Sequence, residues 1–292
     1  MKFDIPSGRY VLAVSGGVDS MVLLDLFNRR DNIDFAVAHF DHGIRLSSHN
    51  DADFVRQKAK SINRKFYCEE GNLGRNASEE RARIARYHFL ENVRQEINAI
   101  AIVTAHHQDD LIETAIINTI RGTGRKGLSS LRSHEQVIRP LLEFPKREVV
   151  NYAVTHNLEW VEDETNRDNK YLRNYIRQNI TQNLSADNRK KLLDLIGESA
   201  KNNDELDILL SEIIPQNNID RRWLISLAHR ETKEVLAELL RWHKVPFDKS
   251  KLEALSVALK TKLNGSSLDI TKGWTFVISG EFIYLVSPNS QR

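Results

Sequence analysis

A six-residue loop, Ser15–Ser20, constrains the fold of this chain more than any other segment. The apolar run before it, Tyr10–Val14, has the length and composition of a buried strand, and the run after it, Asp19–Arg30, repeats apolar residues at helical spacing. Two consecutive glycines between the runs, Gly16 and Gly17, allow a tight turn without side-chain obstruction. A strand, a glycine turn and a helix in this order predict the first unit of a parallel α/β sheet.

The same loop, which also contains Val18, has the chemistry of an anion site. A helix that begins near Asp19 directs its free N–H groups and the positive end of its dipole at the loop, and Ser15 and Ser20 add hydroxyl donors. Asp19 is placed to hold a divalent cation against phosphate oxygens. The loop is neither a Walker A motif nor G-x-G-x-x-G. It resembles the PP-loop of the N-type ATP pyrophosphatases, although a serine/glycine turn without a ligand has a similar composition.

Strand-like and helix-like segments alternate through the first part of the chain. The strand candidates are Tyr10–Val14, Phe35–Phe40, Lys65–Cys68 and Ala99–Ala105. The helix candidates are Asp19–Arg30, Ser48–Ile62, Ala77–Ile97, Asp109–Arg121, Lys146–His156 and Asn169–Leu184. This alternation predicts a Rossmann-like parallel sheet with helices on both faces, in a first domain of residues 1–182. Ligands of such sheets bind beyond the carboxyl ends of the strands, where the loops 15–20, 39–45 and 106–110 are expected to lie.

The pattern changes in residues 183–292. Three segments read as helices: Lys190–Ile214, Arg222–Trp242 and Lys249–Leu263. The segment Ser267–Val286 then alternates apolar and polar residues around two glycine-containing turns, which predicts an antiparallel hairpin. We expect a smaller, mostly helical second domain that ends in a β-hairpin.

Composition excludes some classes of protein. No apolar run approaches the ~18–20 residues of a membrane helix, and the N-terminus lacks the pattern of a signal peptide. We therefore expect the protein to be cytoplasmic and to have no membrane partner. Cys68 is the single cysteine among 292 residues. Cysteine-rich metal sites and disulfides within one chain are therefore excluded. Because it lies in a strand-like run, Cys68 is expected to be a core residue rather than a nucleophile.

A second motif, Thr104–Thr114, begins where a predicted strand ends and continues into a helix. Its three acids, Asp109, Asp110 and Glu113, share one helix face near the N-terminus, which exceeds what helix capping needs. The natural partner of these acids is a cation, either Mg²⁺ or an ammonium group, although an acidic first turn on a surface helix is the simpler alternative. The adjacent His106 and His107 lack the i, i+4 spacing of zinc-binding helices. We expect them to bond substrate or phosphate, or to be satisfied, partly buried side chains.

Two clusters of basic residues stand out against a net charge of only +2. Arg125 and Lys126 lie in an interval without acids, and Arg173 and Arg177 belong to a second basic stretch. Such clusters bind phosphates or RNA, or form a solvated face.

Seven matches in order and spacing make the resemblance to a family specific. They are Ser15–Ser20, His39–Arg45, Ala82–Tyr87, His106–Thr114, Arg121–Gly124, Ile138–Leu142, and Asp163–Asn166 followed by Tyr171–Asn174. Over residues 10 to about 180 the chain resembles the tRNA(Ile)-lysidine synthetase family. The resemblance implies ATP-dependent attachment of L-lysine to the cytidine at the first anticodon position of tRNA(Ile) with a CAU anticodon. It also implies a short form without an extra C-terminal domain, in which residues 183–292 bind the tRNA. Members are often dimers, so a homodimer is a further expectation.

The family mechanism implies roles for individual residues. Ser15–Ser20 would hold the ATP phosphates, Ala38, His39 and His42 would lie near the adenine or ribose, and His106 would bond the nucleotide. Adenylation of the base followed by attack of the lysine amine builds charge on the phosphate, which Arg86 with Arg173 or Arg177 would stabilise. Asp110 and Glu113 would bind Mg²⁺ or the lysine ammonium, and one of them would accept its proton. Asp19 and Asp110 are the expected Mg²⁺ ligands.

Three alternatives remain open. A PP-loop tRNA thiolase shares the adenylation step, but delivers sulfur with paired cysteines or an iron–sulfur cluster that one cysteine cannot form. An NAD or GMP synthetase also uses an amine, but lacks the His106–Thr114 and Tyr171–Asn174 patterns. A non-catalytic RNA-binding relative has no need of carboxylates beside a phosphate loop.

Overall fold

A computed structural model describes residues 1–41, 43, 48–71, 79–162, 172–215, 218–271 and 273–288. The chain divides into two compact units, one formed by Met1–Arg121 with Ser129–Leu193 and the other by Gly122–Leu128 with Asp194–Arg292. One long helix, α7 (Ala186–Ile213), begins in the first unit and continues into the second.

The first unit contains a parallel sheet with the strand order β3-β2-β1-β4-β5, as the sequence predicts. Its strands are β1 (Gly8–Ala13), β2 (Ile33–Asp41), β3 (Phe66–Glu70), β4 (Ala101–Val103) and β5 (Val137–Ile138). β1 is central because its residues are apolar on both sides, and Tyr10, Val11 and Leu12 are all fully buried. β5 was not predicted, because a strand of two residues carries no periodic pattern.

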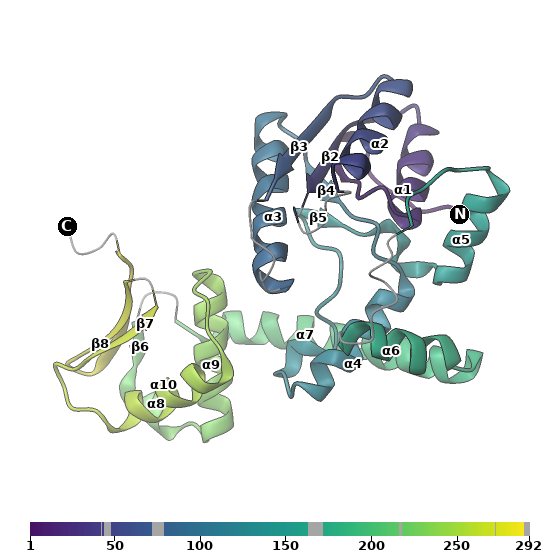
Figure 1. The fold of residues 1–292 in the computed structure, drawn as a ribbon. Coiled ribbons are helices and arrows are strands. Elements are labelled where there is room, and N and C mark those ends of the chain that lie inside the picture. The colour runs from purple at the N-terminus through teal and green to yellow at the C-terminus, as the bar shows by residue number, and fades with distance from the viewer. Residues whose placement is uncertain are drawn as a thin grey trace. The chain divides into compact units, whose positions relative to one another are not determined.

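Helices cover both faces of this sheet (Figure 1). Those of the first unit are α1 (Val18–Asn28), α2 (Ser48–Ser61), α3 (Glu79–Glu96), α4 (Gln108–Ile120), α5 (Lys146–Thr155) and α6 (Leu172–Asn179). Successive residues of β1 point to opposite faces, so Leu12 shares a core with α1, α2 and α5 while Val11 shares a core with α3. The predicted Rossmann-like architecture of the first unit is confirmed.

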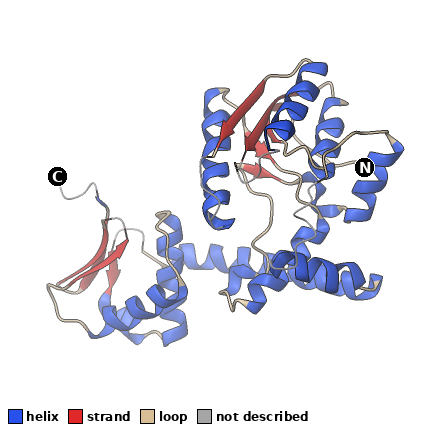
Figure 2. Cartoon of the chain, viewed as in Figure 1, coloured by secondary structure: helices blue, strands red, loops and turns tan. Residues whose placement is uncertain are grey.

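The second unit combines helices with an antiparallel sheet of order β6-β9-β8-β7 (Figure 2). Its elements are β6 (Asn218–Asp220), α8 (Arg221–Ser226), α9 (His229–Trp242), α10 (Lys249–Thr261), β7 (Ser267–Thr271), β8 (Trp274–Ser279) and β9 (Phe282–Val286). Gly273 (φ +82°) and Gly280 (φ +62°) make the turns on either side of β8, in the left-handed region that favours glycine. Leu236, Leu240 and Phe276 are fully buried in a core shared by α9 and the sheet. The predicted hairpin is therefore present as part of a four-stranded sheet.

One predicted helix of the second unit is wrong in its extent. Arg222–Trp242 was expected to be continuous, but the chain is extended at Ala228 (φ −60°, ψ 155°), which separates α8 from α9. The side chain of Glu231 accepts a hydrogen bond from the Ala228 N–H (2.9 Å) and so starts a new helix there. No glycine or proline interrupts Arg222–Trp242, which is why the sequence did not reveal the break.

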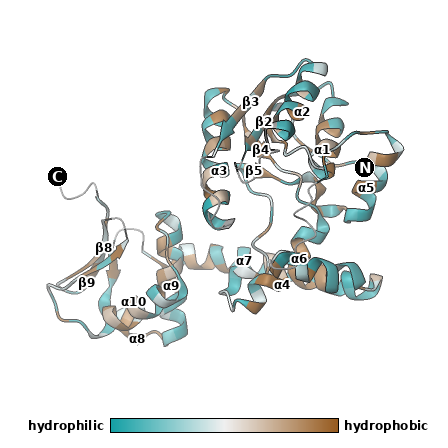
Figure 3. Ribbon diagram, viewed as in Figure 1, coloured by the Kyte–Doolittle hydropathy of each residue, from teal (hydrophilic) through white to brown (hydrophobic). Residues whose placement is uncertain are grey.

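Hydrophobic and hydrophilic residues lie side by side along the helices of both units (Figure 3). Within the described ranges, no helix has both the length and the apolar character needed to cross a bilayer. The amphipathic pattern instead directs one face of each helix to the core of its own unit.

Cys68 corrects another expectation. It lies in β3, which is an edge strand of the sheet, and its side chain is exposed rather than part of the core. An edge strand is covered less completely than a central one, so its apolar residues need not be buried.

Candidate active site

The loop Ser15–Ser20 follows β1 and is held in shape by its own groups. Gly16 has φ +92°, a backbone conformation that residues other than glycine rarely adopt. The hydroxyl of Ser20 donates to the Gly17 carbonyl (2.8 Å) and accepts from the Gly16 N–H (3.1 Å), and the Ser15 hydroxyl lies 3.3 Å from it. Ser20 is buried and braces the turn, whereas Ser15 is exposed.

The N-terminus of α1 faces this loop without a cap. Gly17 is the N-cap residue, and no side chain of the described chain forms a capping hydrogen bond there. The first N–H groups of a helix have no partner within the helix, so an uncapped N-terminus is suited to bind an anion. Val18 and Asp19 are the first two helical residues. The geometry of the loop is compatible with an anion, and its binding of phosphate stays a prediction.

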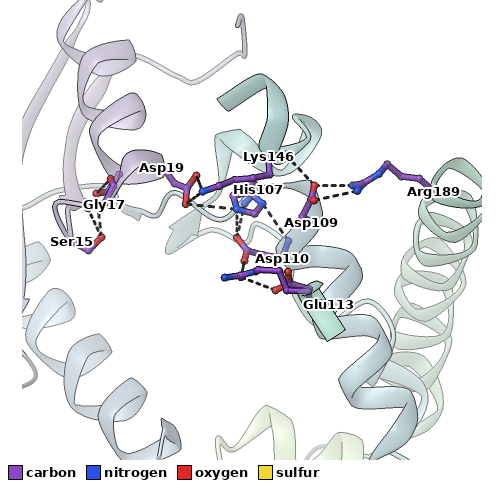
Figure 4. A network of polar contacts seen from close by, with 11 residues as sticks. Ser15, Gly17, Asp19, His107, Asp109, Asp110, Glu113, Lys146 and Arg189 are labelled. Carbon is purple, nitrogen blue, oxygen red and sulfur yellow. Dashed lines mark hydrogen bonds and ion pairs between the residues drawn. The ribbon is translucent and has the colours of Figure 1, made fainter. Parts of the chain in front are cut away.

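One histidine, His107 at the N-terminus of α4, lies near an aspartate of α1 and an aspartate of α4. His107 is the N-cap of α4: its Nδ1 accepts from the Asp110 N–H (3.4 Å), and its own N–H donates to Asp110 Oδ2 (3.0 Å). Because Nδ1 accepts, a ring proton is placed on Nε2, which lies 3.4 Å from Asp110 Oδ2 and 3.7 Å from Asp19 Oδ2. One buried imidazole thus stands between the carboxylates of Asp19 and Asp110 (Figure 4).

Asp110 and Glu113 share a guanidinium from α6. Arg177 donates from Nε to Glu113 Oε1 (2.8 Å) and from Nη2 to Glu113 Oε2 (2.9 Å), and its Nη2 also lies 3.4 Å from Asp110 Oδ1. Glu113 is completely buried, and this burial raises the pKa of its carboxyl despite Arg177. Burial acts in the same direction on Asp110, but His107, His106 and Arg177 hold the pKa of Asp110 below its usual value. The different environments of the two acids therefore shift their pKa values in opposite directions.

His106 occupies a different environment from His107. Its Nδ1 lies 2.8 Å from the hydroxyl of Thr104. Burial, together with the nearby Arg139, Arg86 and Arg83, lowers the pKa of His106 to about 3, so the ring is neutral at physiological pH. The predicted residues His106 and Arg86 are thus close enough for the positive charge of Arg86 to lower the pKa of His106. Arg173, a further predicted arginine, donates to the hydroxyl of Thr114 (3.2 Å) on α4.

Asp109 differs from the neighbouring Asp110 in its partners, which come from α5 and α7. Its Oδ1 accepts from Arg189 Nη1 (2.8 Å) and from the backbone N–H of Lys146 (3.1 Å), and its Oδ2 accepts from Arg189 Nη2 (3.2 Å). Asp109 therefore joins the N-terminus of α4 to those of α5 and α7. It is not available as a ligand without breaking these bonds.

Lys146 belongs to the site although no motif of the sequence indicated it. Its Nζ donates to both oxygens of Asp19, at 2.6 and 2.8 Å (Figure 4). The two residues are 127 positions apart, and Lys146 is the first residue of α5. The only available signal was a basic residue at the start of a predicted helix, which is too common to single out.

The residues predicted near the adenine or ribose are partly outside the described residues, and the others are buried in β2. His39 is buried in β2, and its Nδ1 donates to the carbonyl of Val14 (2.8 Å). Ala38 is also buried in β2, and its carbonyl accepts from the Val14 N–H (2.9 Å). His42 and the motif residues Asp163–Asn166 and Tyr171 lie outside the described residues.

The residues present fit a metal ion only if a substrate shares it. Among the described residues, no three His, Cys, Asp or Glu side chains converge as a metal site by themselves. Mg²⁺ is commonly bound by one or two carboxylates together with substrate phosphates and water. Asp19 and Asp110, on either side of His107, provide this kind of donor set next to the phosphate loop.

The basic cluster Arg125–Lys126 corrects an expectation of the sequence. It was a candidate RNA-binding or solvated surface, but in the second unit Arg125 donates to Glu234 (2.9 Å), Asp207 (2.5 Å) and Glu238 (3.2 Å). Lys126 pairs with Glu238 (3.1 Å) and Asp207 (2.7 Å). These acids come from α7 and α9, more than 80 residues later, so the sequence near Arg125 gave no sign of them.

Comparison with known proteins agrees with this geometry. The model of the PP-loop domain family matches residues 2–184. This is more than half of the chain, and the chain belongs to the PP-loop domain family.

Its relatives are similar over the same region. The tRNA(Ile)-lysidine synthase of Rickettsia felis is 39% identical over 204 residues, which cover 67% of this chain and 46% of that protein. That of Rickettsia prowazekii is 39% identical over 181 residues, or 59% of this chain and 42% of that protein. The match thus spans less than half the length of these relatives. The U34-tRNA thiolase NcsA from Methanococcus maripaludis shares the fold, with a TM-score of 0.56 at 18% identity over 68% of this chain and 73% of that one.

Proposed function

We propose that this protein uses ATP to ligate L-lysine to the cytidine at the first anticodon position of tRNA(Ile) with a CAU anticodon, releasing AMP and pyrophosphate. The observation that carries the proposal is the juxtaposition of an uncapped glycine loop with a buried acidic pair, Asp110 and Glu113. The loop suits a triphosphate, and the acidic pair suits an amine. The similarity to tRNA(Ile)-lysidine synthases supports this combination.

The first step transfers AMP to the nucleobase. The carbonyl oxygen of the cytidine attacks the α-phosphorus, an oxygen–phosphorus bond forms, and the bond to the β-phosphate breaks so that pyrophosphate leaves. The N–H groups at the start of α1 and the loop Ser15–Ser20 would hold the phosphates. Arg86, near the neutral His106, would stabilise charge that builds on the α-phosphate. Mg²⁺ held by Asp19 and Asp110 would neutralise phosphate charge when ATP is bound.

In the second step the ε-amine of lysine attacks the activated ring carbon and AMP leaves with the former carbonyl oxygen. The free amine is needed, and lysine has an ordinary pKa of about 10.4, so its ammonium must first lose a proton. Glu113 suits this role because burial raises the pKa of its carboxyl. Asp110, with a lowered pKa, suits binding of the ammonium.

Arg177 occupies the acidic pair in the free protein, so the arriving ammonium would share or replace its contacts. An arginine released in this way would be free to turn toward phosphate charge, the role that we propose for Arg177 and, beside it on α6, Arg173.

The single cysteine supports an amine rather than a sulfur nucleophile. Cys68 is exposed on the edge strand β3, and this chain has no second cysteine with which to form a persulfide relay or hold a cluster. The thiolase with the same fold therefore supports the architecture of the site, not its chemistry.

We further propose that residues 183–292 contact the tRNA, because a substrate of that size needs more surface than a nucleotide site provides. ATP and tRNA are cytoplasmic substrates, so we expect the enzyme to act there.

The test is incorporation of labelled lysine into a tRNA(Ile) transcript with a CAU anticodon, in the presence of ATP and Mg²⁺. We expect one lysine per tRNA and one AMP per lysine, and no incorporation when uridine replaces the first anticodon cytidine. Release of ADP instead of AMP, or no incorporation with either transcript, would contradict the proposal.

A further inference from the structure

The glycine loop lacks a basic residue of its own. In a Walker A motif, a lysine within the loop reaches the phosphates, whereas Ser15–Ser20 contains only an acid, Asp19. A loop of this kind presents N–H groups but must also neutralise the charge of a triphosphate. A cation from elsewhere in the chain would add to the positive charge that Mg²⁺ supplies.

Lys146 is a cation at this place. Its ammonium bonds both carboxylate oxygens of Asp19, one residue after the first residue of α1. Figure 4 shows its side chain reaching from α5 to the carboxylate of Asp19, with the glycine turn on the other side of Asp19. The ammonium is thus held close to the N-terminal end of α1.

The backbone of Lys146 is fixed while its side chain keeps some freedom. Asp109 accepts from the Lys146 N–H, and Arg189 holds Asp109 with two further hydrogen bonds. The side chain beyond this anchor is 36% exposed. A lysine has a flexible four-carbon stem, so the ammonium can move from one anion to another without moving α5.

We propose that Lys146 is a phosphate-binding residue that supplies, from α5, the positive charge that the glycine loop lacks. In the free protein Asp19 holds its ammonium. When ATP binds, the ammonium turns to a phosphate oxygen, and Asp19 becomes available to Mg²⁺. The inference rests on the proposed function only in that ATP is the ligand of the loop.

The alternative is that Lys146 only neutralises Asp19, so that the carboxylate does not repel the phosphates. The two explanations differ when Asp19 is removed. If Lys146 binds phosphate, Asp19→Asn frees its ammonium, and ATP binding without Mg²⁺ becomes tighter. If it only neutralises Asp19, its own removal has no effect once Asp19→Asn is present.

The experiment measures ATP affinity by equilibrium dialysis, with EDTA present and tRNA and lysine absent. The variants are Lys146→Met, Asp19→Asn and the double variant, with Lys58→Met as the matched control. Lys58 pairs with Glu159 (2.6 Å), and its side chain is 33% exposed, close to the value for Lys146. Thermal unfolding of each variant checks its fold.

We expect Lys146→Met to weaken ATP binding about 10- to 100-fold, the range for one hydrogen bond to a charged group. The loss should persist in the Asp19→Asn background, and Lys58→Met should bind ATP as the wild type does. Because the double variant leaves no unpaired charge, it carries the test even if Lys146→Met alone unfolds. Equal ATP affinity of Asp19→Asn and the double variant would overturn the inference.

The readout separates this inference from the proposed function. Wild-type protein that binds ATP but ligates no lysine contradicts the ligase proposal and leaves Lys146 to be judged by its own variants. Wild-type protein that binds no ATP, with or without Mg²⁺, overturns both.

Discussion

The two units each contain a cluster of acids and bases, and the clusters differ in what lies beside them. In the second unit Arg125 and Lys126 meet Asp207, Glu234 and Glu238. The amide of Asn203 completes this cluster by donating to the Arg125 carbonyl (3.1 Å) and accepting from Arg125 Nη1 (3.2 Å). Every one of these contacts joins the segment Gly122–Leu128 to the rest of its unit.

The cluster of the first unit has similar chemistry but adjoins the phosphate loop. Asp19, Asp110 and Glu113 are each paired with a cation of the chain, yet they stand next to a helix whose N-terminus has no capping side chain in the described structure. Ion pairs alone therefore do not mark a functional site. What distinguishes the first cluster is its position beside the N-terminal N–H groups of α1, at the carboxyl edge of a parallel sheet.

The largest effect expected from this difference is on catalysis. Glu113→Gln keeps the size of the side chain but removes the proposed proton acceptor, and we expect lysine ligation to fall about 10²–10⁴-fold, the usual contribution of a general base. Asp110→Asn should lose activity as well, through weaker binding of lysine. Single-turnover lysine transfer to tRNA, with tRNA affinity measured separately, checks both variants.

The second cluster supplies the control for this prediction. Asp207→Asn also removes a carboxylate from an arginine, but at a distance from the loop in sequence and in a different unit. We expect the folded variant to ligate lysine at the wild-type rate. If Glu113→Gln is equally active, Glu113 has no catalytic role and the contrast between the clusters fails.

Much of the fold was predictable because it depends on local patterns. Apolar runs separated by amphipathic ones predicted the strands and helices of the parallel sheet, and the glycines predicted the turn after β1. The break before α9 was missed because it depends on one hydrogen bond, from the Ala228 N–H to the Glu231 side chain, rather than on periodicity. The two-residue strand β5 was missed because it is too short to show a pattern.

The site was predictable where its residues are close in sequence. Ser15–Ser20 and the acids of α4 could be found because each motif lies on one turn or one helix face. The pairing of Asp19 with Lys146 could not, since it depends on how α5 packs against α1. The partners of Asp109 and Asp110 could not be predicted for the same reason. The two acids are adjacent in sequence and share a helix turn, but Asp109 pairs with Arg189 and Asp110 with Arg177.

The next effect tests whether the second cluster is structural. Arg125→Met leaves three carboxylates around a position where the native side chain is only 15% exposed, and we expect the second unit to lose about 2–3 kcal/mol of unfolding free energy. Urea unfolding followed by tryptophan fluorescence measures this, because Trp223, Trp242 and Trp274 all lie in the second unit.

Arg222→Met is the matched control for this measurement. Arg222 pairs with Glu281, but both side chains are mainly exposed, at 82% and 60%, and such pairs contribute roughly 0–1 kcal/mol. If Arg125→Met unfolds at the same urea concentration as Arg222→Met, the Arg125 cluster is not what stabilises the second unit.

The smallest expected effect concerns His106 and the pH dependence of stability. Because the pKa of His106 falls from its ordinary 6.5 to about 3 on folding, the folded protein favours the neutral ring. Its contribution to stability is present above pH 6.5 and is lost progressively as the pH falls toward 3. Burial of Glu113 acts in the opposite direction, since the raised pKa of its carboxyl favours the folded state until the pH rises through that pKa.

The comparison of wild type with His106→Asn isolates the histidine, because Glu113 is present in both. Asparagine can keep the hydrogen bond to Thr104 but does not titrate. We expect the free energy of unfolding, measured with urea by circular dichroism, to decrease less between pH 7.5 and pH 5 in His106→Asn than in the wild type. His88→Asn, at an exposed position on α3, should behave as the wild type does. Identical pH dependence in wild type and His106→Asn would mean that burial and the arginines near His106 do not disfavour its protonation, and that the first unit tolerates an additional positive charge there as readily as water does.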